Sequence, residues 1–225
     1  MLSDDKRIRI IVGHYGSGKS EIAMNYATKL RKETNEKIAL SDLDVVNVYF
    51  RTREQKDFLE SINIHTIYSS IDAPALDLPA VSAEVMTPIN DKSYNYIMDI
   101  GGDKVGARVI ARFKNMIKED EYDMFFVINA NREQTQTVEN IITHIDEIQK
   151  TSGLKITGLI SNTHMIRFTT IEDIIKGYKL TKEVSDISNM PIKYITCIEN
   201  LLDEIPSEIN ESILPINLYM RDKWM

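Results

Sequence analysis

The chain has 225 residues, 43% of them hydrophobic, with 34 acidic against 27 basic residues and a formal net charge of −7. This length and composition indicate one globular domain over residues 1–225, and they argue against disorder and against several domains. The acidic balance disfavours nucleic acid and anionic membranes as partners, and the absence of a long apolar run or a signal-peptide pattern predicts a cytoplasmic protein.

Short apolar runs alternate with segments of helical spacing along the whole chain. Because the runs are continuously apolar, they are typical of buried parallel strands. The expected strands are Arg7–Val12, Lys37–Ser41, Ile64–Tyr68, Tyr94–Asp99, Asp123–Asn129, Ile156–Ser161 and Ile192–Cys197. Apolar stripes predict helices over 22–30, 105–117, 138–148 and 171–178, the last one opening at a capping-box pattern from Thr169 to Glu172. The fold class predicted is α/β, with three α/β/α layers, a mostly parallel central sheet and ligands beyond the carboxyl ends of the strands.

A phosphate-binding pattern follows the first strand directly. Gly13-His14-Tyr15-Gly16-Ser17-Gly18-Lys19-Ser20 matches G-x-x-x-x-G-K-[ST] at every fixed position. Glycines let backbone N–H groups point at phosphate oxygens, and the following helix N-terminus adds to the attraction. Lys19 is expected to reach the β- and γ-phosphates and the Ser20 hydroxyl to ligate Mg²⁺. The alternative is an ordinary glycine-rich turn between a strand and a helix.

Carboxylates follow the next two long strands at the same predicted sheet edge. Asp42 and Asp44 lie on one side of an extended chain, so one is expected to orient an attacking water and the other to bind Mg²⁺ through water. The spacing does not decide which carboxylate orients the water. Asp99 ends an apolar run and is expected to hold Mg²⁺ or its water, while Gly101 or Gly102 would offer an N–H to the γ-phosphate and move when it leaves. Polar strand ends and an Asx turn are the alternative.

These motifs, in this order, resemble the MinD/ParA-like branch of the SIMIBI class of P-loop NTPases over nearly the whole chain. The resemblance implies an ATP-binding, Mg²⁺-dependent switch that hydrolyses ATP to ADP and phosphate, commonly as a homodimer, and acts on a partner protein. It implies catalytic roles for Lys19 and Asp44, Mg²⁺ ligation by Ser20, Asp42 and Asp99, and switch roles for Asp44, Asp99, Gly101 and Gly102. The implied nucleotide-binding residues are Gly13, Tyr15, Gly16, Ser17, Gly18, Lys19, Ser20, Glu21 and Asn162.

The choice of ATP depends on the end of the strand that finishes at Ser161. Asn162 resembles the family's asparagine that reads adenine, since an amide offers both a donor and an acceptor. An ordinary turn asparagine is the alternative. The chain has no Asn-Lys-x-Asp pattern of guanine readers, which favours ATP over GTP.

Departures from the family pattern limit what the resemblance implies. His14 stands where the family's signature lysine crosses the dimer interface, and histidine is shorter and only partly charged, so dimerisation stays open. His14 and Tyr15 covering the outer surface of the loop is the alternative. The single cysteine, Cys197, excludes the branches that carry an iron–sulfur cluster. Pro215 interrupts the apolar end of the chain and disfavours a membrane-targeting helix.

Two segments and two rival functions remain open from the residues alone. Arg51-Thr52-Arg53-Glu54 would lie near phosphate or a partner, or begin a solvated helix, and Ala73–Ala80 would face a partner or bury against the sheet. A small-molecule kinase would keep the phosphate loop and transfer the γ-phosphate to a metabolite. A sensor would bind ATP without hydrolysing it. The partner protein is not identified by the sequence.

Overall fold

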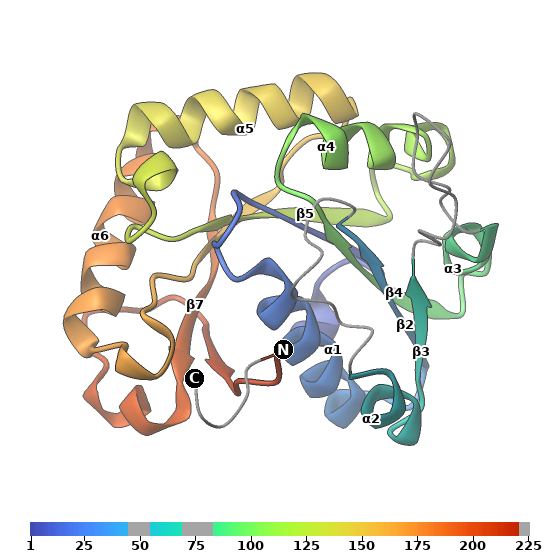
Figure 1. Ribbon diagram of the computed structural model, residues 1–225, viewed down its shortest axis with the longest axis horizontal. Helices are drawn as coiled ribbons and strands as arrows, with labels where there is room; N and C mark the ends of the chain where they lie inside the picture. Colours follow the sequence, from blue (N-terminus) through green and yellow to red (C-terminus); the bar gives the residue numbers. More distant parts are fainter. Residues whose placement is uncertain (45–54, 69–82, 221–225) are drawn as a thin grey trace.

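The computed structural model describes residues 1–44, 55–68 and 83–220. Their strands form one sheet of eight, in the order β3-β2-β4-β1-β5-β6-β7-β8, and every neighbouring pair is parallel (Figure 1). The strands are β1 Ile8–Val12, β2 Lys37–Leu43, β3 Ile64–Tyr68, β4 Tyr94–Ile100, β5 Tyr122–Ile128, β6 Gly158–Ser161, β7 Ile192–Ile198 and β8 Ile213–Ile216. The predicted parallel α/β fold is confirmed.

Helices cover both faces of this sheet. The α-helices are α1 Lys19–Glu33, α2 Lys56–Ser61, α3 Met86–Asn90, α4 Lys104–Ala111, α5 Val138–Ser152 and α6 Ile171–Ser188. In Figure 1, α1 and α2 lie on one side of the sheet and α4 and α5 on the other, while α6 packs beside β6 and β7. The order places β1, and the phosphate-binding pattern after it, in the middle of the sheet.

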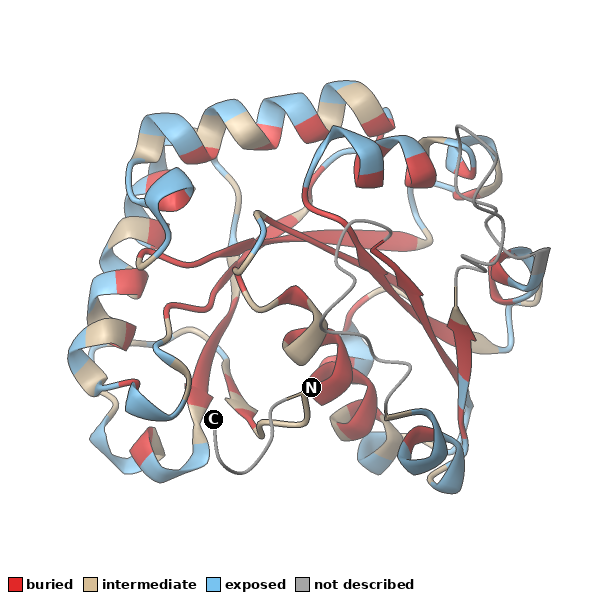
Figure 2. Cartoon of the chain, in the orientation of Figure 1, coloured by how far each residue is buried: buried red, intermediate tan, exposed pale blue. Residues whose placement is uncertain are grey.

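The core has two main parts, one on each face. One contains the α1 residues Ile22, Tyr26 and Leu30, and the other contains Ile141 and Ile145 of α5. All five residues of β1 are buried, as are the inner strands generally (Figure 2). A continuously apolar strand is what two covered faces require, which explains why these strands could be predicted.

Some predicted boundaries were wrong. The helix predicted over 105–117 ends at Ala111 and is followed by a 3₁₀ turn, Lys114–Met116. The capping box of α6 uses Thr170 and Asp173, one residue later than predicted, because the Thr169 hydroxyl instead donates to the carbonyl of Ile166 at 2.6 Å. The strand β8 was missed. Pro215 lies within it, and an edge strand tolerates a residue that cannot donate.

Two regions discussed from the sequence lie outside the described residues. These are the segment from Val45 through Glu54, with its arginines, and the Ala73–Ala80 loop. Within the described ranges, none of the helices has both the length and the apolar character that crossing a bilayer demands.

Candidate functional site

The phosphate-binding pattern forms the turn between β1 and α1, and its glycines adopt backbone angles that other residues rarely take. Gly16 and Gly18 have φ values of 76° and 88°, and Gly18 is the N-cap of α1. A Cβ atom on Gly18 would lie 2.3 Å from the Asn162 amide nitrogen. Glycine is therefore required here both by conformation and by the close approach of a neighbouring strand end.

Side chains that follow β5 hold this turn in place. Arg132 Nε donates to the Gly16 carbonyl at 2.9 Å, and Asn129 Nδ2 donates to the same oxygen at 3.4 Å. Sequence reasoning assigned neither residue a role. The available signal was position, because Asn129 comes directly after a strand that ends at the same sheet edge.

Four predicted residues meet beneath the turn in a buried charged cluster. Lys19 Nζ lies 3.7 Å from Asp44 Oδ2, and both side chains are buried. Asp42 pairs in register with Asp99 across β2 and β4, and its Oδ1 accepts from the Asp44 N–H at 3.3 Å. The structure therefore brings together Lys19, the three carboxylates and the start of α1, as the motifs predicted.

Asp99 is the residue of this cluster whose carboxylate has the fewest hydrogen bonds. Its exposed fraction is 0%, and neither carboxylate oxygen makes a well-formed hydrogen bond with the described residues. Burial raises its pKa to about 8, with the nearby Asp42 carboxylate adding to the rise and Lys19 and the Ser20 hydroxyl opposing it. An uncompensated buried carboxylate is costly unless a cation or a proton arrives.

The cluster fits a Mg²⁺ ion that is shared with a phosphate ligand. No set of three His, Cys, Asp or Glu side chains arranged as a full metal cage occurs in the described ranges. Mg²⁺ in phosphate sites does not need one, because it keeps several waters and takes one or two protein oxygens. The orphaned oxygens of Asp99 and the adjacent Ser20 hydroxyl are donors of that kind.

The glycines after β4 pack directly on this cluster and on the phosphate loop. A Cβ atom on Gly102 would lie 1.6 Å from the Gly13 carbonyl oxygen, and one on Gly101 would lie 3.1 Å from Asp44 Oδ1. The Asp103 carboxylate caps α4 by accepting from the Gly106 N–H at 2.8 Å. The predicted switch residues thus lie against the loop whose ligand they were expected to sense.

Histidine side chains occupy the other side of this glycine pair. His144 Nε2 lies 2.5 Å from the Gly102 carbonyl oxygen, and its ring meets the His14 ring edge-on with centroids 5.5 Å apart. His14 therefore packs within its own chain, while its neighbour Tyr15 is 59% exposed. His144 was missed, although it falls on the apolar stripe of α5 at helical spacing from Ile141 and Ile148.

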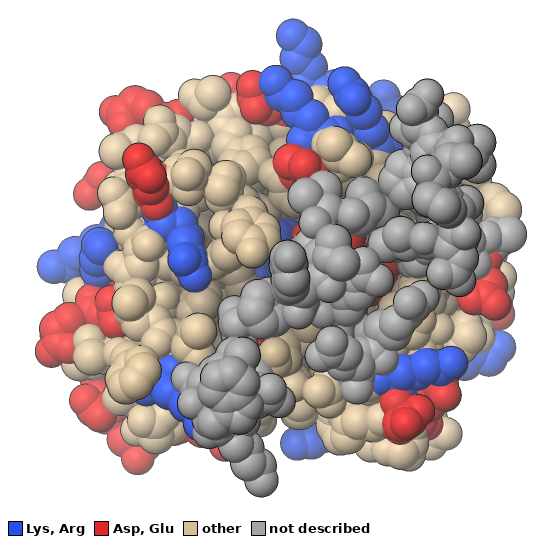
Figure 3. Space-filling view, in the orientation of Figure 1, with Lys and Arg blue, Asp and Glu red and all other residues tan. Residues whose placement is uncertain are grey.

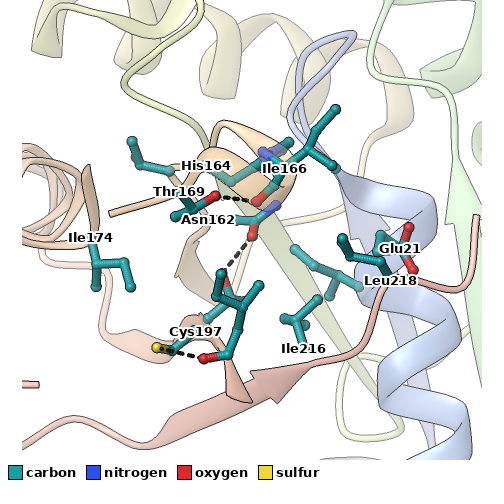
Figure 4. Close-up of a pocket in the computed structure, with 14 residues that line it drawn as sticks. Glu21, Asn162, His164, Ile166, Thr169, Ile174, Cys197, Ile216 and Leu218 are labelled. Carbon is teal, nitrogen blue, oxygen red and sulfur yellow. Dashed lines mark hydrogen bonds between the residues drawn. The ribbon is translucent and has the colours of Figure 1, made fainter. Parts of the chain in front are cut away.

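A largely apolar pocket opens beside Gly18, at the ends of β6, β7 and β8 (Figure 4). Its walls include Ile174, Cys197, Ile216 and Leu218. Asn162 lies in the pocket with much of its amide already used. Its Nδ2 donates to the Ser17 carbonyl at 2.6 Å, and its Oδ1 accepts from the Thr196 hydroxyl at 2.5 Å. One N–H and one acceptor site of the amide remain.

The segment after β8 closes one side of this pocket and is held by α1. The Glu21 carboxylate accepts from the backbone N–H groups of Tyr219 and Met220, and the Asn25 amide exchanges two hydrogen bonds with the Asn217 backbone at 2.8 and 2.7 Å. The Tyr219 ring stacks on Phe58 of α2. We call residues 217–220 the C-terminal strap. Glu21, predicted to bind nucleotide, thus contacts the strap at the edge of the pocket.

Charged side chains on the face that carries the site are mixed in sign. Figure 3 shows basic side chains gathered over α4, which carries Lys104 and Arg108, and acidic side chains along the left margin of the view. Binding to a nucleic-acid backbone favours one continuous basic stripe. On the described part of this face the charged side chains instead form separate groups of each sign.

Comparisons with known proteins bear on the fold. No protein-family model matches the chain, and no curated protein matches it. FtsY from Thermotoga maritima is similar in structure, with a TM-score of 0.56 and 20% identity over 85% of this chain and 62% of that one. FtsY from Mycoplasma mycoides gives 0.54 and 17%, over 84% and 59%. FlhF complexed with GTP and Mg²⁺ gives 0.51 and 16%, over 83% and 64%.

The chain spans less than two thirds of the length of each of these structures. The likeness concerns the parallel sheet and the helices packed on it. The protein thus has the α/β fold of the P-loop NTPases FtsY and FlhF.

Proposed function

We propose that the protein is a Mg²⁺-dependent P-loop nucleotide switch of the SIMIBI class, and that it binds and hydrolyses ATP. The observation that carries the proposal is Asp99, a buried carboxylate without a well-formed hydrogen bond that lies beside Lys19 and Ser20 at the phosphate turn. Such an arrangement is unfavourable in an empty site and favourable once a cation and phosphates arrive. The MinD/ParA type, action on a partner protein and a cytoplasmic location are parts of the same proposal.

The chain's own groups supply the steps of hydrolysis. Backbone N–H groups of the turn and the N-terminus of α1 hold the phosphates, and Lys19 exchanges Asp44 for a phosphate oxygen. Ser20 and Asp99 would hold Mg²⁺, with Asp42 acting through water, and the ion would supply neutralisation of the negative charge on the phosphates. Asp44, released from Lys19, accepts a hydrogen bond from the attacking water and orients it.

The lining of the pocket beside Gly18 supports adenine over guanine. Guanine presents two donors on one edge, an N1–H and an amino group, and a free carboxylate can accept a hydrogen bond from both. Among the described residues of this pocket Glu21 supplies the carboxylate, and its oxygens accept backbone N–H groups of the C-terminal strap. Asn162 keeps one donor and one acceptor, which suits the adenine edge. FlhF was solved with GTP, so guanine nucleotides are the required comparison.

Titration calorimetry and phosphate release on one set of variants test this proposal. We expect Mg²⁺-ATP to bind more tightly than Mg²⁺-GTP, and Lys19→Ala to weaken ATP binding by about 10- to 100-fold, because hydrogen bonds to charged groups contribute about 1.5–3 kcal/mol. Asp44→Asn should keep binding and slow phosphate release by about 100-fold. Lys32→Ala, which changes an exposed lysine at the far end of α1, is the matched control.

Each rival gives a different result in this experiment. If the wild-type protein binds ATP without releasing phosphate, the protein would be an ATP sensor and not an ATPase. If an added acceptor then becomes phosphorylated, the protein would be a kinase. Tighter GTP than ATP binding would overturn the adenine assignment. Unchanged ATP binding by a folded Lys19→Ala variant would contradict the assignment of the whole nucleotide site.

A further inference from the structure

A histidine of α5 holds the backbone of the loop that follows Asp99. His144 Nε2 lies 2.5 Å from the Gly102 carbonyl oxygen. A carbonyl oxygen can only accept, so Nε2 must carry the hydrogen and donate it. The bond fixes the peptide group between Gly102 and Asp103, at a glycine whose backbone would otherwise rotate with little cost.

The ring of His144 is itself fixed by contacts from two other elements. It meets the Phe126 ring of β5 edge-on with centroids 5.4 Å apart, and the His14 ring of the phosphate loop at 5.5 Å. A side chain held on these sides places its Nε2 at a defined point. His144 therefore connects three elements of the site: β5, the phosphate loop and the loop after β4.

Gly102 is a position where small backbone movements matter. A Cβ atom there would overlap the Gly13 carbonyl oxygen at 1.6 Å, so the Gly102 backbone lies directly on the start of the phosphate loop. Gly101, one residue earlier, faces Asp44. The hydrogen bond from His144 holds the Gly102 carbonyl toward α5. It thereby orients the Gly101–Gly102 backbone relative to the place where the terminal phosphate would bind.

The surroundings of His144 favour its neutral form. Burial lowers the pKa of His144, and the nearby His14 and Lys19 lower it further. The hydrogen bond to Gly102 and the negative charge of Glu147 each raise the pKa and oppose this shift. Lys104 of α4 pairs with Glu147 at 3.1 Å. Both residues line a surface hollow together with His144 and Asp103. A neutral ring with its hydrogen on Nε2 is the form that donates to Gly102 without placing a charge beside the phosphate loop.

We propose that His144 is a positioning residue of the nucleotide switch, which holds the Gly101–Gly102 loop in the conformation that distinguishes a nucleoside triphosphate from a diphosphate. This inference rests on the proposed function. It assigns the discrimination to a side chain on α5 that does not itself touch the nucleotide. Loss of the bond should weaken the triphosphate complex and leave the diphosphate complex nearly unchanged.

The experiment compares the affinities of ADP and of a non-hydrolysable ATP analogue, with Mg²⁺, in wild type, His144→Leu and His144→Gln. We expect His144→Leu to reduce the ratio of the ADP dissociation constant to that of the analogue by about five- to tenfold, as the loss of one hydrogen bond implies. His144→Gln should restore most of the ratio, because its amide nitrogen can donate to the same carbonyl. Thr143→Val, on the neighbouring α5 position that lines the same hollow, is the matched control.

Amide hydrogen exchange of the nucleotide-free variants shows whether the loop itself is released. Exchange around Gly102 should be faster in His144→Leu than in His144→Gln or Thr143→Val, with the remainder of the sheet unchanged. An unchanged affinity ratio in a folded His144→Leu variant would overturn the inference and leave the proposed function standing. A glutamine variant as impaired as the leucine variant would also overturn it. Wild type that binds neither nucleotide would overturn both.

Discussion

The two ends of the sheet bury charge in different ways. At the amino ends of the strands, Arg9 is 1% exposed, and its guanidinium donates to Asn95 Oδ1 at 2.5 Å and to the carbonyls of Leu2 and Asp5 at 3.2 and 2.9 Å. At the carboxyl ends, Asp99 is equally buried, yet among the described residues neither of its oxygens has a well-formed hydrogen bond.

Asp5, whose backbone carbonyl accepts a hydrogen bond from Arg9, shows the same contrast in a carboxylate. Asp5 accepts from the Tyr26 and Tyr194 hydroxyls at 2.6 and 2.5 Å and pairs with Lys193 at 3.0 Å. A charged group that makes most of its hydrogen bonds inside the chain, as Arg9 does through its Nη atoms, needs no ligand. A buried carboxylate without a well-formed hydrogen bond costs stability until a ligand arrives. The amino end of the sheet therefore contributes to holding the fold together, and the carboxyl end is where a ligand has the most to gain.

The largest effect is expected at the amino end. Arg9→Met removes the donors to three buried oxygens and should lower the free energy of unfolding by about 3–5 kcal/mol, as when one partner of a buried charged network is removed. Guanidinium unfolding measures the loss, and ATP affinity of the folded variant should stay unchanged. Lys118→Met, which alters an exposed lysine before β5, is the control. A loss below about 1 kcal/mol would mean that the network is not structural.

A pair of amide substitutions should give opposite signs at the two ends. In chelator and without nucleotide at pH 8, Asp99→Asn should raise the free energy of unfolding by about 1–3 kcal/mol, because it removes a buried carboxylate that has no well-formed hydrogen bond. It should also abolish the Mg²⁺ dependence of ATP binding. Asp123→Asn should instead destabilise by about 1 kcal/mol, because it disturbs a buried carboxylate. Asp123 accepts from the Lys6 N–H and the Thr157 hydroxyl, both at 2.9 Å. Equal signs for the two variants would contradict the comparison.

The smallest effect concerns acid. Hydrogen bonds from Lys92 and Arg7 lower the pKa of Glu121 from 4.5 to about 2. The folded protein therefore resists protonation of Glu121 more than the unfolded chain does, and this contribution to stability is full above pH 4.5 and lost as the pH falls toward 2. Glu121→Gln should reduce the loss of unfolding free energy between pH 4.5 and pH 2 by about 1 kcal/mol. The figure is kept small because solvent screens the interaction of Glu121 with the exposed Lys92. Glu119→Gln changes an exposed partner of Lys155 and should leave the curve unchanged.

The parts of the fold that could be predicted are those with a local signal. The turn from Gly13 to Ser20 is specified by its own glycines, and buried parallel strands have continuous apolar runs that mark them directly. Strand order then brings Asp42 level with Asp99, as expected for residues at the ends of neighbouring parallel strands. The strand β8 gave no such signal, because it is short, contains Pro215 and is defined by pairing at the sheet edge.

The missed parts of the site depend on contacts between distant segments. The sequence placed Asn162 at a strand end, but it does not show that Ser17 and Thr196 engage the amide. Arg132 reaches Gly16 across 116 positions of sequence, and no local pattern records such a contact. His144 is the intermediate case. Its place on the apolar stripe was visible, whereas its partner Gly102 was not.

The C-terminal strap has a consequence for the order in which the site is made. Glu21 and Asn25 belong to α1, and the strap residues that they bind follow 198 and 192 positions later in the chain. A nascent chain that already carries the phosphate loop, Asp44 and Asp99 still lacks one wall of the pocket beside Gly18. Translation must pass residue 220 before α1 has all of these contacts, so the pocket acquires this wall only after every described strand of the sheet has been synthesised.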